Sequence, residues 1–201
     1  MAITPELQTL RNAVVQLDPL QPGDAPDLFS ALDDDRVWAG GWGGGPAARP
    51  EQAEGMSAVV AKLIEGGYAW VVRDATDGRV VGTASLLEVD IANERCMFGG
   101  AAYSPDVWGS PVNAATNLAL LGYAFEGCGF GRVMLQTDVL NTRMSAAIEK
   151  MGATAEGVLR RHKRRADGTF RDSAVFSIIA DEWPDVRSRL QARVGTEPEP
   201  A

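Results

Sequence analysis

Backbone N–H groups, rather than reactive side chains, form the clearest chemical feature of this sequence. Residues 98–126 read as a strand, then a turn of chain breakers from Pro105 to Pro111, then a helix. The apolar positions of that helix recur at helical period: Ala114, Leu118, Leu121 and Phe125. Because unpaired N–H groups and the helix dipole converge at a helix N-terminus, this junction is suited to bind an anion. An ordinary strand-to-helix connection explains the same short pattern.

The titratable side chains offer few candidates for acid–base chemistry. His162 is the only histidine, and it lies in a basic run, ArgArgHisLysArgArg, typical of a solvated hairpin face. The run from Arg160 to Arg165 could also attract an acidic substrate. Asp172 could orient an amine, although an ion pair with Arg171 explains it more simply. Cys96 and Cys128 lack metal-ligand spacing and read as small buried apolar groups, so we expect no metal site.

A glycine-rich loop, residues 37–50, carries Trp38 and Trp42. Flexible linkers seldom hold two large aromatic side chains. We therefore interpret the loop as a lid on the substrate side, with both tryptophans lining a pocket. The alternative, in which they only anchor the loop to the core, has equal weight.

Hydrophobic periodicity places these candidates on a single α/β (α+β) domain. The expected strands are 13–17, 68–73, 79–87, 95–104, 132–140, 157–164 and 169–179. The expected helices are 22–32, 51–65, 112–126, a short one between Asn141 and Gly152, and 183–193. This order implies a mixed, mostly antiparallel sheet with helices on both faces. Residues 12–193 form the domain, preceded by a loose lead-in (1–11) and followed by a disordered acidic tail (194–201).

Composition narrows the function classes. The chain has 201 residues and a net charge of −8, which disfavours general nucleic-acid or anionic-membrane binding. No apolar run approaches the roughly 20 residues that a membrane span needs, and the N-terminus lacks the layout of a signal peptide. Two cysteines without a disulfide framework fit a reducing cytoplasm.

Several segments together resemble the GNAT superfamily of acetyl-CoA-dependent N-acetyltransferases, and within it the Rim-type branch that includes ribosomal-protein alanine N-acetyltransferases. The resemblance covers residues 12–193 and is strongest from Tyr103 to Pro184. The motifs that carry it are a Trp-Gly turn before a helix, TyrAlaPheGlu, AspValLeuAsn, AlaIleGluLysMetGly and GluGlyValLeuArg.

The resemblance implies a GNAT fold whose fourth and fifth strands, here 95–104 and 132–140, splay apart to admit acetyl-CoA. Pantetheine would pair with the backbone of Ala101, Ala102 and Tyr103 as an added strand. The pyrophosphate would lie on the turn and the first helical residues: Trp108, Gly109, Ser110, Val112, Asn113, Ala114 and Ala115. Asn141 and Arg143 complete the implied cofactor contacts, and the basic run could alternatively bind the 3′-phosphate.

The implied reaction transfers an acetyl group to a primary amine of a small molecule or a protein N-terminus. A neutral amine attacks the thioester, backbone N–H groups stabilise the oxyanion, and a weak acid protonates the thiolate. Ser145 and Tyr103 are the candidates for that acid. Glu94, the carboxylate nearest to a position where the family often has Glu, is out of place, because Met97 occupies that position.

Other positions depart from the family pattern. Pro111 replaces a glycine of the phosphate turn and removes an N–H donor. Met144 stands where the family often has Ser, with Ser145 one place later, and Ala114 and Ala115 replace polar residues. A weakened or non-catalytic acyl-CoA-binding protein and an enzyme for a longer acyl donor therefore remain alternatives. The resemblance leaves a homodimer open.

Overall fold

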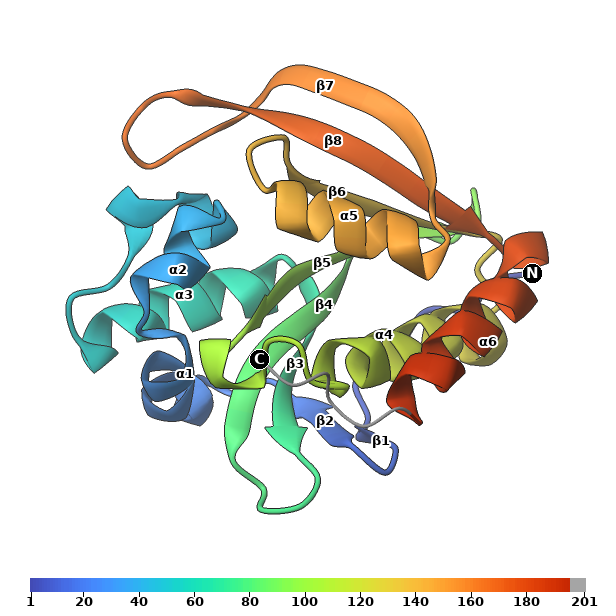
Figure 1. Ribbon diagram of the computed structural model, residues 1–201, viewed down its shortest axis with the longest axis horizontal. Helices are drawn as coiled ribbons and strands as arrows, with labels where there is room; N and C mark the ends of the chain where they lie inside the picture. Colours follow the sequence, from blue (N-terminus) through green and yellow to red (C-terminus); the bar gives the residue numbers. More distant parts are fainter. Residues whose placement is uncertain (196–201) are drawn as a thin grey trace.

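The computed structural model describes residues 1–195, which form one eight-stranded sheet with helices on both faces (Figure 1). The strands are β1 (Leu10–Arg11), β2 (Val15–Pro19), β3 (Gly67–Asp74), β4 (Val80–Asp90), β5 (Arg95–Tyr103), β6 (Arg132–Asp138), β7 (Thr154–Arg164) and β8 (Phe170–Ile179). The helices are α1 (Ala25–Leu32), α2 (Asp35–Ala39), α3 (Ala53–Glu65), α4 (Val112–Gly122), α5 (Thr142–Met151) and α6 (Trp183–Val194). Among these residues, no helix is both long and apolar enough to cross a membrane.

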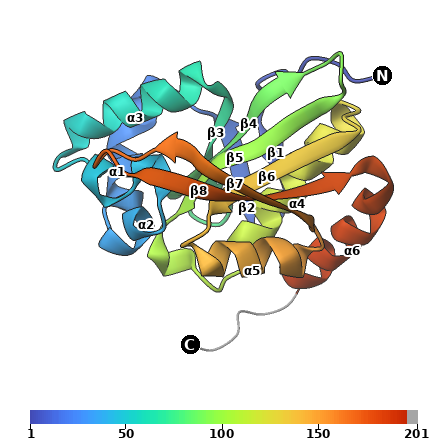
Figure 2. The same ribbon diagram turned by 90° about the horizontal axis from the view of Figure 1, so that it is seen from above.

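Alternating side chains assign the helices to the two faces of the sheet. Along β3, Trp70 and Val72 belong to one buried cluster, while Ala69 and Val71 belong to another. The first cluster packs against α4, α5 and α6, and the second against α1, α2 and α3. Successive strand residues point to opposite faces, so a strand buried on both sides needs an unbroken apolar run. The sheet therefore has two cores, and Figure 2 shows α1–α3 and α4–α6 grouped apart.

The sheet order is β1-β2-β3-β4-β5-β6-β8-β7, and every neighbouring pair is antiparallel except β5–β6. The parallel ladder joins residues 95–98 to residues 132–135 and stops at Phe98 and Leu135. Beyond that point β6 stays paired with β8 as far as Asp138, and β5 stays paired with β4 as far as Tyr103. The two strands thus separate at their C-terminal halves, which confirms the expected mixed sheet with a splayed central pair.

The N-terminal segment differs from the loose lead-in that we expected. Leu10 and Arg11 pair with β2, and Ala2 is buried. The Ile3 N–H donates to the Cys128 carbonyl (2.8 Å), and the Trp70 indole donates to the Gln8 carbonyl (2.8 Å). These partners lie more than 60 residues away, so no local pattern in residues 1–11 could have indicated them. The acidic tail lies almost wholly outside the described residues.

Candidate functional site

A cavity of about 490 Å³ lies where β5 and β6 separate. Residues 98–101 of β5 and 135–138 of β6 form two of its walls. Apolar residues of α5 form a third: Met144, Ala147, Ile148 and Met151. Asn113 and Asn117 of α4 lie at one end, and α3, residues 40–44 and the β7–β8 hairpin surround the other. A splayed strand pair therefore creates a long cavity with an open backbone edge.

A bulge at Gly100 shapes the β5 wall. The β4–β5 register shifts between Thr83 and Ser85, and Gly100 has a φ of 61°. A Cβ atom at Gly100 would lie only 2.8 Å from the Ser85 hydroxyl oxygen, so the position needs glycine for both its backbone and its space. The Gly100 carbonyl accepts a hydrogen bond from the Trp42 indole (3.1 Å). The bulge thus turns this part of the β5 backbone towards the cavity.

The turn between β5 and α4 presents unpaired N–H groups. Pro111 occupies the N-cap of α4 with φ −65°, so its missing N–H removes no donor from the helical turn that follows. The Ala115 N–H donates to the Pro111 carbonyl, which leaves the N–H groups of Asn113 and Ala114 at the free end of the helix. A Cβ atom at Gly109 would meet no atom within 4 Å. The geometry therefore keeps the anion-binding character that Pro111 placed in doubt.

The side chains of this turn are used for packing. Val112, Ala114 and Ala115 are buried in the core beneath α4, so they could offer a ligand only backbone atoms. The Ser110 hydroxyl donates to the Val107 carbonyl (2.7 Å) and accepts weakly from the Val112 N–H (3.3 Å).

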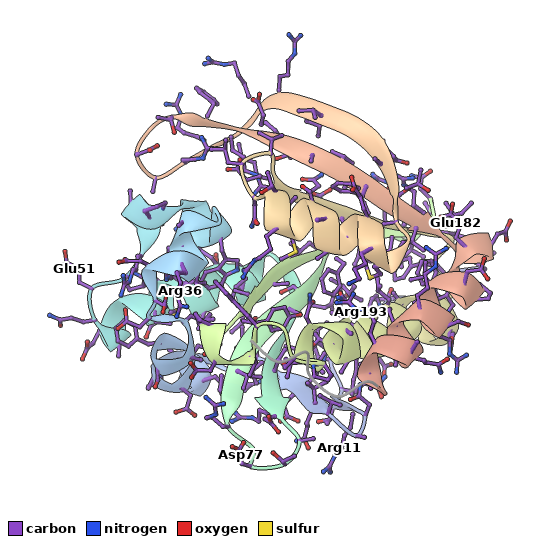
Figure 3. The ribbon with its side chains drawn as sticks, in the orientation of Figure 1. Arg11, Arg36, Glu51, Asp77, Glu182 and Arg193 are labelled. Carbon is purple, nitrogen blue, oxygen red and sulfur yellow. The ribbon has the colours of Figure 1, made fainter. Side chains whose placement is uncertain are left out.

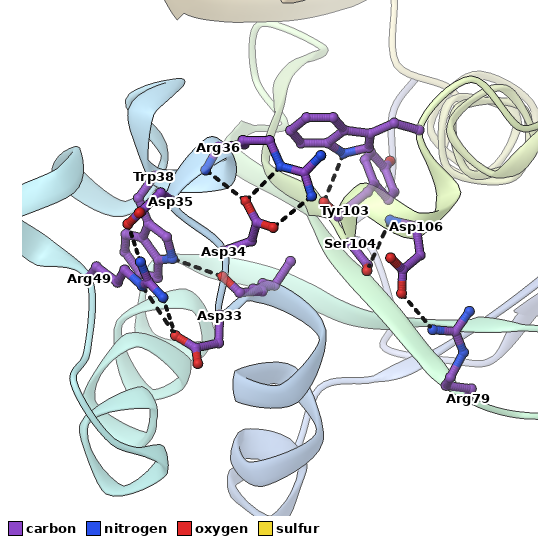
Figure 4. A network of polar contacts seen from close by, with 12 residues as sticks. Asp33, Asp34, Asp35, Arg36, Trp38, Arg49, Arg79, Tyr103, Ser104 and Asp106 are labelled. Carbon is purple, nitrogen blue, oxygen red and sulfur yellow. Dashed lines mark hydrogen bonds and ion pairs between the residues drawn. The ribbon is translucent and has the colours of Figure 1, made fainter. Parts of the chain in front are cut away.

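Trp108 carries two arginines on its ring. The guanidinium carbon of Arg143 lies 3.5 Å from the ring centroid, and that of Arg36 lies 5.5 Å from it. Desolvation lowers the pKa of Arg143, and the neighbouring charge of Arg36 adds to this effect. Arg36 also donates to both carboxylate oxygens of Asp34 (2.9 and 2.7 Å; Figure 4). Arg143 therefore lies beside the turn with a guanidinium that no carboxylate neutralises among residues 1–195.

The two tryptophans of the glycine-rich loop have different roles. Trp38 is 1% exposed and donates from its indole to the Leu32 carbonyl (2.9 Å), so it anchors the loop to the core. Trp42 packs edge-on against it, with 4.9 Å between the ring centroids, and lines the cavity. The lid interpretation thus fits the position of Trp42, and the anchor interpretation fits that of Trp38.

Asn141 lies at the end of β6, where it joins three elements. Its side-chain oxygen accepts from the Met144 N–H (3.1 Å) and caps α5, while its amide nitrogen donates to the Gly40 carbonyl (3.0 Å). Asn141 also lines the cavity. Its polar atoms are therefore engaged in holding the glycine-rich loop and α5 at the cavity.

Replacing Asn141 with alanine is expected to cost about 1 kcal/mol of stability through the lost cap. It should also weaken cofactor binding or turnover, because the Gly40 loop loses its tie to α5. Thermal unfolding and calorimetry with CoA measure the two effects separately. Unchanged affinity and turnover, together with the stability loss, would reduce Asn141 to a helix cap.

The two candidate acids do not line the cavity. The Tyr103 side chain is buried in the core near Thr116, and burial raises the pKa of its hydroxyl. This placement corresponds to the packing alternative for an aromatic residue at a strand end. Ser145 is half-buried on α5, whereas Met144, Ala147 and Ile148 of the same helix face the cavity. The step from Met144 to Ser145 thus turns the hydroxyl off the cavity wall, as 3.6 residues per turn requires.

Sequence reasoning missed an ion pair that closes one end of the cavity. Asp138, 3% exposed, accepts from Arg165 at 2.6 Å (Oδ2 to Nη2), and its other oxygen accepts from the Leu140 N–H (3.0 Å). The Ala166 N–H donates to the Gly44 carbonyl (3.2 Å), so the β7–β8 turn is bonded to the glycine-rich loop. The ion pair and the Ala166–Gly44 bond each join residues far apart in sequence. The only sequence signal at Asp138 was its place in the AspValLeuAsn motif.

His162, Asp172 and the two cysteines lie outside the cavity walls. His162 contacts the buried Ser173 hydroxyl through Nδ1 (3.0 Å), and desolvation with the charges of Lys163 and Arg171 lowers its pKa. The Asp172 carboxylate accepts from the Arg161 N–H (2.6 Å). Cys96 and Cys128 are buried, and burial raises the pKa of Cys96 to about 12, so neither thiol is suited to be a nucleophile.

The sequence matches the family model described as Acetyltransferase (GNAT) domain over residues 15–154. The chain belongs to the GNAT acetyltransferase family. No curated protein matches its sequence. The splayed strands β5 and β6, and the cavity between them, are therefore features of an acyltransferase. Among residues 1–195, no group of side chains could hold a metal ion.

Solved structures resemble the whole domain. A T. thermophilus protein assigned as an acetyltransferase is 32% identical, with a TM-score of 0.84, over 96% of this chain and all of its own. A GCN5-related N-acetyltransferase from Brucella melitensis shares the fold at 24% identity and a TM-score of 0.88, over 96% and 88% of the two chains. RimJ from Mycobacterium smegmatis, solved with CoA-disulfide, shares it at 22% identity and a TM-score of 0.75, over 92% of each chain.

Proposed function

We propose that this GNAT protein is an acetyl-CoA-dependent N-acetyltransferase of the Rim type, with a primary amine of a small molecule or a protein N-terminus as its acceptor. The observation that carries the proposal is the cavity at the separation of β5 and β6, which has an open strand edge on one side and Asn113, in the first turn of α4, at one end. The fold likeness to RimJ supports the choice of branch. Cytoplasmic location and homodimer formation stay predictions.

The residues present fit acetyl-CoA, which supplies an activated thioester. The β5 edge from Gly99 to Tyr103 has no strand partner on the β6 side and could pair with an extended chain. Gly109, Asn113 and Ala114 would offer N–H groups to the pyrophosphate, and Arg143 would add a positive charge. Gly99, Gly100 and Ala101 line the cavity at the bulge, so backbone N–H groups of this segment could stabilise negative charge on an oxygen.

Proton transfer has no dedicated side chain in this proposal. Among residues 1–195, the only carboxylate lining the cavity is Asp138, which is already bonded to Arg165, and the other charged groups there are cations. Cations disfavour a protonated amine nearby and so favour the neutral, nucleophilic form. With no such side chain in the wall, water would accept the proton from the acceptor nitrogen as the C–N bond forms and the thioester C–S bond breaks, and water would protonate the released thiolate.

The proposal is tested by the binding of CoA. At 100 times its dissociation constant, CoA should raise the free energy of unfolding by about 2.7 kcal/mol, measured as a higher melting temperature. Ser110→Glu adds a carboxylate to the phosphate turn and should weaken binding, which titration calorimetry at low salt would detect. Ser188→Glu, on the exposed side of α6, is the matched control. Binding that is absent, or unaffected by Ser110→Glu, contradicts the proposed cofactor site.

One observation favours a longer acyl donor as the second candidate. The α5 wall of the cavity is wholly apolar at Met144, Ala147, Ile148 and Met151. These side chains could accommodate more methylene groups than an acetyl group has. Comparing turnover with acetyl-CoA and butyryl-CoA separates the two donors. Binding of both without turnover on any amine would support the non-catalytic alternative.

A further inference from the structure

The cavity end opposite α4 carries an excess of positive charge, although the chain as a whole is acidic. We infer that the acceptor carries a carboxylate a few bonds from its amine, and that Lys62, Lys163, Arg164 and Arg171, here called the basic rim, bind it. This inference rests on the proposed N-acetyltransferase function and specifies its substrate class.

The charge count around the cavity supports an anionic ligand. The net charge of the chain is −8, and exposed acidic residues such as Glu51 and Asp77 lie on its periphery (Figure 3). The charged residues lining the cavity are the basic rim, Arg165 and Asp138. Arg165 and Asp138 neutralise each other, so the rim has no matching carboxylate in the wall. Within residues 1–195, none of the four rim residues forms an ion pair.

The position of the rim favours the acceptor over the cofactor. Three rim residues lie on the β7–β8 hairpin, whose turn is bonded to Gly44 through Ala166. Figures 1 and 2 both show this turn on the side of the molecule that carries α1–α3, at a distance from α4, where the free N–H groups for a pyrophosphate lie. Cofactor phosphates and the rim therefore occupy different ends of one cavity. An acceptor that enters at the rim end meets the bulge at Gly100 from the side opposite α4.

The two arginines of the rim are held in place before any ligand arrives. The Arg171 Nε donates to the fully buried Ser173 hydroxyl (2.9 Å), which also contacts His162. The Arg164 guanidinium carbon lies 4.5 Å from the Phe170 ring centroid, and its Nη1 donates to the Gly168 carbonyl (3.1 Å). A preorganised guanidinium loses less freedom on binding a carboxylate.

The rim charges also repel one another. Desolvation is the main cause that lowers the pKa of Lys163, and the charge of Arg171 adds to it. Desolvation likewise lowers the pKa of Arg171, with a further contribution from Arg165. Two carboxylates act in the opposite direction: Glu88 on Lys163, and Asp138 on Arg171. A ligand carboxylate would relieve the remaining repulsion, which is the physical reason for binding.

Matched acceptors test the inference. The C-terminally amidated peptides Ala-Asp-Glu-Gly-NH2 and Ala-Asn-Gln-Gly-NH2 have side chains of the same size, but only the first carries carboxylates, and 4-aminobutyrate and its amide are the corresponding small pair. At saturating acetyl-CoA, the carboxylate member of at least one pair should show a kcat/KM at least tenfold higher than its neutral partner. The pair that responds distinguishes an acidic peptide from a small amino acid.

Rim variants locate the effect. The double variant Lys163→Gln, Arg171→Gln should remove most of the carboxylate preference by raising KM, while CoA affinity stays within twofold by calorimetry. Lys150→Gln, on the exposed side of α5, is the control and should leave the preference intact. A tenfold loss of CoA affinity in the double variant would instead assign the rim to the cofactor and overturn the inference.

A binding readout keeps this test separate from that of the proposed function. Because Trp42 lines the cavity, its fluorescence should change when an acidic peptide binds, with or without turnover. Tighter binding of the acidic peptide than of the neutral one, lost in the double variant, supports the rim even if no amine is acetylated. Equal binding of both peptides overturns the inference even if CoA binds as proposed.

Discussion

Replacing Asp138 with alanine is expected to lower the free energy of unfolding by about 3 kcal/mol, the lower end of the range for breaking a buried ion pair. The variant leaves Arg165, whose side chain is 19% exposed, without its carboxylate, and the Leu140 N–H without its acceptor. Because Arg165 is partly exposed, water can solvate its unpaired guanidinium and offset part of the lost stability. The expected cost is therefore at the lower end of that range. For a chain of this length, the melting temperature should fall by roughly 6–12 °C in thermal unfolding.

Two further variants show whether the unpaired charge is the cause. Asp138→Ala combined with Arg165→Met removes both charges and should recover most of the lost stability. Asp167→Ala, an exposed carboxylate in the same hairpin turn that accepts from Thr169, is the matched control and should cost less than about 1 kcal/mol. If Asp138→Ala costs no more than this control, the ion pair is not what holds the hairpin turn to the end of β6.

Most of the sheet could be predicted because its signals are local. Residues 132–140 alternate in polarity, and Asp77-Gly78 marks the β3–β4 turn, as the structure confirms. The bulge in β5 likewise falls at a glycine, Gly100, which has the positive φ that such a bulge needs. In each case, the residue type and the backbone conformation are related within a few positions.

The cavity itself could be predicted only in outline. Its two long walls follow from the family fold, but its end depends on contacts between distant segments, such as Asp138 with Arg165 and Gly44 with Ala166. No periodicity within one segment reports such a contact. The basic run was noticed in the sequence, yet only the folded hairpin brings Lys163 and Arg171 together with Lys62 of α3.

Position within an element decides two points that residue type alone left open. In a loop, a proline in place of glycine removes one N–H donor. Pro111 occupies the N-cap of α4, where its missing N–H does not affect the donors of the following helical turn. Trp38 and Trp42 lie only four positions apart. Trp38 belongs to α2 and is buried in the core, whereas Trp42 lies in the loop after α2 and lines the cavity. Residue type alone could not distinguish them.

The rate of acyl transfer is expected to rise about tenfold per pH unit below the pKa of the acceptor amine and to level off there. The sign follows from the amine: protons occupy its lone pair at low pH, so the fraction of free amine grows tenfold per unit until the pKa is reached. In the part of the chain that the structure describes, no side chain on the cavity wall is placed to act as a base, because Asp138 is bonded to Arg165 and the other charged groups are cations. The pH at which kcat/KM levels off, measured at saturating acetyl-CoA, should therefore shift with the pKa of the acceptor amine.

Removing the candidate acids and bases one at a time should then have little effect. Ser145→Ala, Tyr103→Phe and Glu94→Gln should each reduce the rate less than tenfold, against the 10²–10⁴-fold contribution of a dedicated acid or base. The structure gives the reason for each. Ser145 and Tyr103 do not line the cavity. Glu94 forms an ion pair with the N-terminal ammonium group (3.4 Å) and accepts a hydrogen bond from the Ala2 N–H (3.2 Å). A thousandfold loss in any one variant, with CoA affinity retained, would identify a proton-transfer residue. A plateau at the same pH for two amines of different pKa would lead to the same conclusion, because the enzyme rather than the acceptor would then set the protonation step.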